Sequence, residues 1–242
     1  MPLAIGTRFF ETKDPHRVSI VKEFVRRASA FASNVLVAVN TEEDVSGALQ
    51  AVNAMKVSGA TAFEVTPWGK FVAPLNVIIS KAVRRGASHL LLASAEVQVT
   101  QAIVSALGRE LGDQTIVVGA AVIGHDLGDG VVIGTGERVP WNTLAMWNLK
   151  YLKVTGFPLI GDAPFDPSQA GVEEVCALSV LQRLYPACRA VLLNVPGVEW
   201  DTAHWDPERL AAHQKKMASK RSRSEKQLAE ANLAPPVIIH VR

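Results

Sequence analysis

Short apolar runs alternate with longer amphipathic segments along the first 112 residues of the chain. The runs that are apolar almost throughout predict buried strands, at residues 3–9, 35–39, 62–65 and 89–93. Between them, apolar residues recur at helical spacing, and ordinary start and stop signals bound these segments. Asp14-Pro15 opens the first helix, and Gly86 and Gly112 follow two later ones. Such strands joined by helices predict a parallel sheet that is covered on both faces.

The second half of the chain is less regular. The expected elements are a strand at 116–123, a hairpin turn at 128–130 into 131–133, a short helix capped by Asn142 and carrying Trp141 and Trp147, a helix from Asp166 to about Leu184, and a last strand at 190–195. Asp206-Pro207 then starts a long polar helix. The chain is therefore predicted to be α/β, a Rossmann-like three-layer sandwich over 1–205 with a polar, basic C-terminal helix and tail over 206–242.

The composition is that of a globular protein, with 48% hydrophobic and 20% charged residues among 242. Twenty-five basic residues against 23 acidic ones leave a net charge of +2, which argues against nucleic acid as the main partner. No window approaches the roughly 18 apolar residues of a membrane helix, and the first residues do not resemble a secretory signal. The two cysteines form neither a disulfide framework nor a metal motif, so we expect a cytoplasmic protein without a membrane span.

In sheets of this kind, ligands bind beyond the carboxyl ends of the strands. Four segments follow the predicted strands and are the first places to look for a site: 7–11, 40–44, 66–70 and 94–98. The first contains Thr7, Arg8 and Glu11, the second begins with Asn40, and the third ends with Lys70.

Groups of residues in these and later segments follow an order that is typical of one protein family. They are Trp68-Gly69-Lys70, Pro74-Leu75-Asn76, the strand 89–93 with Ser94-Ala95-Glu96 after it, and Gly156-Phe157 ahead of Gly171-Val172-Glu173-Glu174. The chain thus resembles the family 2 type of GT-A glycosyltransferase over about residues 3–200, with order and spacing rather than any single motif carrying the resemblance. The resemblance implies a GT-A-like fold and a nucleoside diphosphate sugar as donor substrate.

The Ser94-Ala95-Glu96 tripeptide stands where the family has Asp-x-Asp, so the motif is degenerate here. The resemblance assigns Glu96 as the remaining metal-binding acid, and His204 as a further candidate ligand late in the chain. Mg²⁺ or Mn²⁺ would suit such oxygen ligands. A departing diphosphate needs either a divalent cation or basic groups to offset its charge. Ser94 cannot act as a charged ligand, which puts the metal dependence of this chain in question.

The resemblance also implies roles for residues that approach the nucleotide. Lys70 and Arg8 would contact phosphate or base, Thr7 and Glu11 would lie in the nucleotide-contacting turn, and Asn40 would replace an Asp that contacts the nucleobase. Glu173 or Glu174 would be the base that deprotonates the acceptor in an inverting transfer. Trp68, Trp141 and Trp147 suit either a sugar-stacking platform or the core.

Two functions of different classes follow. The first is a glycosyltransferase that moves a sugar from a nucleoside diphosphate donor to an unknown acceptor. The second is a non-catalytic GT-A-like domain that binds a nucleotide or a protein partner, and the loss of the first acid favours it. The polar segment 206–231 fits a solvated helix that lies on the domain. It could also cover the cleft, pair with a second copy of the chain as a homodimer, contact anionic lipid headgroups, or hold a diphosphate through its basic residues.

Overall fold

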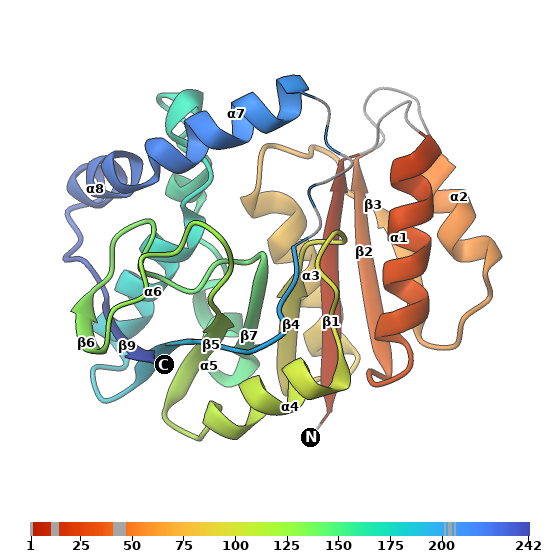
Figure 1. Cartoon of the computed structure of the whole chain (residues 1–242), viewed down its shortest axis with the longest axis horizontal. Helices are drawn as coiled ribbons and strands as arrows, with labels where there is room; N and C mark the ends of the chain where they lie inside the picture. Colours follow the sequence, from red (N-terminus) through yellow and green to blue (C-terminus); the bar gives the residue numbers. More distant parts are fainter. Residues whose placement is uncertain (1, 11–14, 41–46, 201, 203–204, 206) are drawn as a thin grey trace.

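The computed structural model of the chain describes residues 2–10, 15–40, 47–200, 202, 205 and 207–242. Figure 1 shows a central sheet with helices packed on both faces. The strands of the described residues are β1 Leu3–Phe10, β2 Asn34–Asn40, β3 Ala60–Glu64, β4 His89–Ala93, β5 Thr115–Ala120, β6 Gly130–Ile133, β7 Leu144–Asn148, β8 Arg189–Leu193 and β9 Val237–Val241.

These strands form one sheet in the order β3-β2-β1-β4-β7-β5-β8-β9-β6. Strands β7 and β6 run antiparallel to their neighbours, and the other adjacent pairs are parallel. This topology confirms the α/β prediction with a mostly parallel central sheet.

The helices of the described residues are short. They are α1 Pro15–Ala28, α2 Gly47–Ala54, α3 Val72–Arg84, α4 Gln101–Glu110, α5 Leu149–Thr155, α6 Glu173–Leu184, α7 Pro207–Ala218 and α8 Lys220–Glu230, with 3-10 turns η1 Leu159–Asp162 and η2 Pro167–Gln169. Within the part of the chain that the structure describes, no helix has the length and apolar character needed to cross a bilayer.

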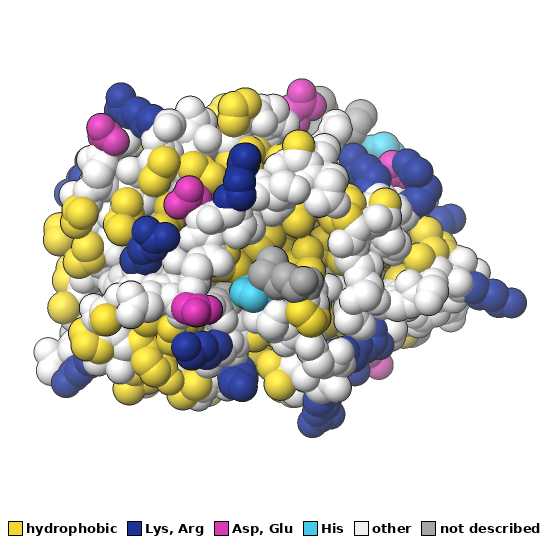
Figure 2. Space-filling model, turned by 90° about the horizontal axis from the view of Figure 1, so that it is seen from below, with side chains coloured by type: hydrophobic (Ala, Val, Ile, Leu, Met, Phe, Trp, Pro, Cys, Tyr) yellow, Lys and Arg dark blue, Asp and Glu magenta, His cyan; other side chains and the backbone are white. Residues whose placement is uncertain are grey.

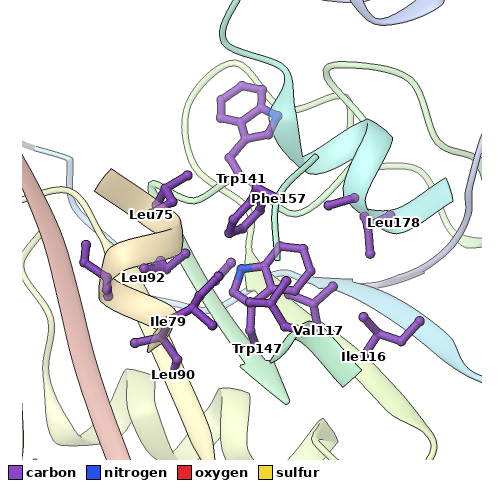
Figure 3. Packing of buried hydrophobic residues seen from close by; sticks show 14 of the residues in the cluster. Leu75, Ile79, Leu90, Leu92, Ile116, Val117, Trp141, Trp147, Phe157 and Leu178 are labelled. Atoms are coloured by element: carbon purple, nitrogen blue, oxygen red, sulfur yellow. The ribbon is translucent and has the colours of Figure 1, made fainter. Parts of the chain in front are cut away.

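Successive residues of a strand enter different cores, because side chains alternate across a sheet. In β4, Leu90 and Leu92 pack with α3, α5 and α6, whereas Leu91 packs on the other face with α1, α2 and α4. Figure 3 shows the first of these cores, in which the rings of Trp147 and Phe157 meet edge-on with centroids 5.2 Å apart. Trp147 is completely buried, so it is a core residue and not part of a sugar platform.

Strand β7 corrects the prediction of a short helix capped by Asn142. Leu144–Asn148 lies between β4 and β5 and every residue of it is buried. A strand that is buried on both faces shows no apolar and polar alternation, and Leu, Ala and Met are good helix formers, so the local pattern favoured a helix.

The C-terminal tail corrects two further predictions. Strand β9 lies between β8 and β6, so the strand at 190–195 is not the last one and residues 131–133 form no hairpin with 116–123. Val131 of β6 instead pairs with Ile239 of β9. The division at residue 205 stays a prediction, and the structure adds that the tail contributes a strand to the main sheet.

The two long helices expected in the second half are each divided. Residues 166–184 form η2 and α6, and Gly171 between them has a φ of +93°, which a helix does not accommodate. The polar C-terminal helix consists of α7 and α8, which meet at Ser219. Helix α7 runs along the end of the molecule at which β1 and β4 finish (Figure 1).

Candidate functional site

A cavity of about 800 Å³ lies at the carboxyl ends of β1 and β4. Its walls come from these strand ends, the loop before α3, the η2 segment and helix α7. Residues that the sequence singled out and that line this cavity are Thr7, Arg8, Trp68, Lys70, Ser94 and Glu96. The structure therefore brings together side chains from three of the four segments that follow predicted strands.

A smaller cavity of about 200 Å³ adjoins the first and contains the two acids expected to include a base. Glu173 and Glu174 line it, together with basic residues of the C-terminal helices. The residues that line both cavities are Arg8, Phe71, Asn142, Thr143, Trp200 and Lys216. The two cavities therefore form one continuous cleft.

Three other residues were named from the sequence, and the structure describes one of them, Asn40. Asn40 is buried at the end of β2 and is not among the residues lining either cavity. Glu11 and His204 lie outside the described residues.

The loop that carries Lys70 is held by an acid from a distant part of the chain. Asp162 accepts hydrogen bonds from the backbone nitrogens of Phe71 at 2.7 Å, Val72 at 2.9 Å and Lys70 at 3.2 Å. These are backbone donors at the start of α3, where a helix has no partners of its own. This capping stabilises the start of α3 at Val72, and it fixes the backbone of Lys70 at the edge of the cleft.

The residues of the degenerate motif hydrogen-bond each other and a residue of α7. Ser94 Oγ donates to Oε2 of Glu96, and Arg209 donates from Nη2 to Oε1 of Glu96 at 2.6 Å. Burial alone would raise the pKa of Glu96, but the bonds from Ser94 and Arg209 outweigh it and hold that pKa below its ordinary value. Glu96 is therefore a carboxylate that is already paired with a cation of the chain.

Glu173 and Glu174 are buried in the first turn of α6. Asn142 donates from its backbone nitrogen to Glu174 Oε1 at 2.8 Å and from Nδ2 to Glu173 Oε1 at 3.3 Å. Trp147 fixes the Asn142 amide by donating from Nε1 to its Oδ1 at 3.0 Å. Burial and the neighbouring Glu174 charge raise the pKa of Glu173 to about 7.

Arg8 connects this buried pair to the larger cavity. Its Nη2 lies 3.8 Å from Oε1 of Glu173, and its guanidinium lies over the Phe71 ring, 4.7 Å from the centroid. The cation opposes the effect of burial on Glu173, so the pKa of this acid rises less than burial and Glu174 alone would cause.

Basic residues of the C-terminal helices line the cleft on its other side. His213 and Lys216 of α7 and Lys220 and Arg223 of α8 all line the smaller cavity. The two residues of each pair are three apart, so they lie on the same face of their helix. The Lys220 side chain is buried with its Nζ 3.7 Å from the centroid of the Trp141 ring, and burial lowers its pKa. This helical spacing could have indicated from the sequence that these basic residues share a surface. The sequence alone did not show that this surface lies on the cleft.

The donor groups of the described residues do not fit a divalent cation. Among the described residues, no group of three His, Cys, Asp or Glu side chains is placed to hold a metal ion. Both oxygens of Glu96, the one acid among the described residues of the larger cavity, already accept hydrogen bonds. The basic residues that line the same cavity are Arg8, Arg17, Lys70, Arg209 and Lys216. The opposite end of the molecule, where β1 begins, instead carries basic and acidic side chains interspersed with apolar ones (Figure 2).

Comparisons by sequence give no relatives for this chain: no family model and no curated protein matches it. Comparisons by structure do. The chain is similar to the mannosyltransferase PcManGT from Pyrobaculum calidifontis in complex with GDP-Man and Mn²⁺, with a TM-score of 0.62 and 12% identity over 96% of this chain. It spans 64% of that protein's length.

Two further solved structures are similar. Glucosyl-3-phosphoglycerate synthase from Mycobacterium tuberculosis gives a TM-score of 0.56 at 11% identity, covering 92% of this chain and 80% of that one. S. aureus TarS 1-349 gives 0.54 at 12% identity, covering 95% and 70%. At these identities the likeness establishes the fold. The chain therefore has a GT-A-like fold, as its sequence resemblance implied.

Proposed function

We propose that the chain is a glycosyltransferase that moves a sugar from a nucleoside diphosphate donor to a hydroxyl group of an acceptor. The observation that carries this proposal is the continuity of the cleft. Cationic side chains line its larger part, and a buried pair of carboxyl groups lines its smaller part. A sugar whose diphosphate lies among the cations would extend toward the carboxyl groups.

The larger cavity suits the donor. Its volume of about 800 Å³ lies within the range of small-molecule sites. Arg8, Lys70 and Lys216 line it and would offset the negative charge that develops on the departing diphosphate. The structure of PcManGT, which has a similar fold, is a complex with GDP-Man, and this supports a sugar nucleotide as the donor.

Glu173 suits the role of base. In the transfer, the acceptor oxygen bonds to the anomeric carbon while the bond from that carbon to the diphosphate oxygen breaks. The electron pair leaves with the diphosphate, and Glu173 takes the acceptor proton. A base works best when its pKa lies near the working pH, and the pKa of Glu173 is about 7. Arg8 lines both cavities, and its Nη2 lies 3.8 Å from Oε1 of Glu173. For this reason we assign the role of base to Glu173 and not to Glu174.

The test is a panel of UDP-, GDP- and ADP-sugars, with thermal shift as the binding measurement and release of nucleoside diphosphate as the measurement of turnover. We expect at least one donor to raise the melting temperature and to be hydrolysed slowly with water as acceptor. Glu173→Gln should keep the thermal shift and lose roughly 100-fold or more of the hydrolysis. Glu225→Gln on the exposed side of α8 is the matched control.

The outcomes separate the two functions that the sequence left open. Binding of a nucleotide without turnover in the unmodified chain would favour the non-catalytic domain. A panel in which no sugar nucleotide changes the melting temperature would refute the proposal.

A further inference from the structure

Helix α7 brings two cations into the cleft although none of its residues is buried. Arg209 pairs with Glu96, and its guanidinium lies 4.0 Å from the centroid of the Trp205 ring. Lys216, two turns further on, lies with its Nζ 5.6 Å from the centroid of the Phe71 ring. His213 between them packs edge-on against Trp200 and Trp205, with centroids 5.1 and 5.0 Å apart. Polar and aromatic contacts thus hold the helix across the cleft.

Glu96 lies where a metal-binding acid would be expected, but its contacts differ from those of a metal ligand. Each of its oxygens accepts a hydrogen bond, one from Ser94 and one from Arg209. The charge that a divalent cation would neutralise is already neutralised by a guanidinium. A metal ion would have to displace that guanidinium and then rely on a single carboxylate of the described residues.

We infer that Arg209, positioned by Glu96, takes the place of the divalent cation and binds the donor diphosphate together with Lys216, so that nucleotide binding requires no metal. This inference rests on the proposed function and specifies how its donor is held. A guanidinium stays protonated at any physiological pH, and its planar fork of donors can bond a carboxylate and a phosphate at once. Glu96 accordingly serves as a positioning residue.

The surroundings of Arg209 agree with this assignment. A pair of metal-binding carboxylates repels a diphosphate unless the metal is present. Here five basic side chains and one acid line the larger cavity among the described residues, so the cavity favours an anion by itself. Trp200 and Trp205 also line this cavity, and the guanidinium of Arg209 lies over the ring of Trp205.

The experiment measures the affinity of the purified chain for UDP, GDP and ADP by calorimetry, once in EDTA and once with Mn²⁺. For the nucleotide that binds best, we expect dissociation constants that agree within about twofold between the two conditions. Arg209→Ala should weaken binding by roughly tenfold or more in EDTA, because it removes a charge-assisted hydrogen bond. Arg209→Lys should recover part of that loss, because it keeps the charge without the fork.

Lys215→Ala provides the matched control, because it removes a cation from the same helix that is exposed and lines neither cavity. Its nucleotide affinity should equal that of the unmodified chain. Circular dichroism and melting temperature verify that each variant is folded, so that a weakened affinity reports the site.

The failure of this inference differs from the failure of the proposed function. Binding that disappears in EDTA and returns with Mn²⁺ would overturn the inference and leave the transferase proposal standing. Unchanged affinity in Arg209→Ala would overturn the role of Arg209 in the same way. If none of the three nucleotides binds with or without metal, the proposed function and the inference fail together.

Discussion

Nη2 of Arg209 lies 2.6 Å from Oε1 of Glu96, and this contact joins helix α7 to the end of strand β4 across 113 residues of sequence. The pair is mostly shielded from solvent, with the side chain of Glu96 11% exposed and that of Arg209 31% exposed. A pair in such a place contributes more than one on the surface, because removing one partner leaves the other charge poorly solvated. The position of α7 over the cleft therefore depends on Glu96.

Glu96→Gln should loosen α7. We expect a loss of about 1–2 kcal/mol in the free energy of unfolding, since one charge of a partly buried pair is removed. Hydrogen exchange of 207–218 should become faster, and trypsin should cleave there sooner. Glu225→Gln breaks the exposed pair with Arg221, and it should change stability by less than about 0.5 kcal/mol. Equal exchange of α7 in both variants would contradict the role given to Glu96.

The burial of Glu173 predicts a pH-dependent stability. Its pKa is about 7 in the folded chain, against 4.5 for the ordinary group, so the folded state binds the proton more tightly than the unfolded state. The stability associated with this proton is fully present below pH 4.5 and is lost as the pH rises through 7, by on the order of 3 kcal/mol. Glu173→Gln, which resembles the neutral acid, should therefore raise the melting temperature more at pH 8 than at pH 5. An identical change at both pH values would contradict the assignment.

The same carboxyl group should govern the pH dependence of donor hydrolysis. A base must be deprotonated to act, so the rate should rise with pH through about 7. The cation of Lys220 lowers the pKa of Glu173, and Lys220→Met removes it while keeping an apolar chain over Trp141. In this variant we expect the rise of the hydrolysis rate with pH to be shifted to higher pH by about one unit. The control Lys215→Met should leave the pH dependence of the rate unchanged. An unchanged pH dependence in Lys220→Met would argue against Glu173 as base.

Much of the fold could be predicted from the sequence because its first half is locally consistent. The continuous apolar runs of β1, β2, β3 and β4 are separated by helices with their own caps and stops, so each element is indicated by nearby residues. Strand β7 could not be predicted, since full burial removed its alternation. Strand β9 could not be placed either, because its pairing with β8 and β6 depends on residues far away in sequence.

The part of the site that the strand ends form could be predicted from the sequence. The part that depends on contacts between residues far apart in the sequence could not. Arg8 lies near the carboxyl end of β1, and Lys70 and Glu96 follow β3 and β4. The rule for ligand sites in such sheets is enough to select these residues. Arg209 and Glu96 are 113 residues apart in sequence, and Asp162 and Phe71 are 91 residues apart. No local sequence pattern indicates either contact.

Asp162 should be needed for the shape of the Lys70 loop. Its carboxylate accepts three backbone hydrogen bonds at the start of α3, so Asp162→Ala should cost about 1–2 kcal/mol of stability. Because Lys70 is then held less firmly, the dissociation constant for the nucleotide should also rise. Asp162→Asn keeps an acceptor oxygen and should recover most of both losses. Calorimetry together with thermal melting would test this, and an Asp162→Ala chain with unchanged affinity would show that Lys70 does not depend on the cap.

Gly161 leaves the space that the first turn of α6 occupies. A Cβ atom at this position would lie 2.7 Å from Cβ of Glu173 and 2.9 Å from its Cα, which is closer than such atoms approach. Gly161→Ala should therefore push Glu173 away from Arg8 and Asn142, at a cost of about 1–3 kcal/mol in stability. We expect donor hydrolysis to fall by at least roughly tenfold, since a displaced base loses its reach to the acceptor, while nucleotide affinity in the larger cavity changes little. Gly112→Ala is the control, because the nearest atom to its Cβ would be 3.9 Å away. A Gly161→Ala chain that hydrolyses the donor at the normal rate would mean that the position of Glu173 does not limit the reaction.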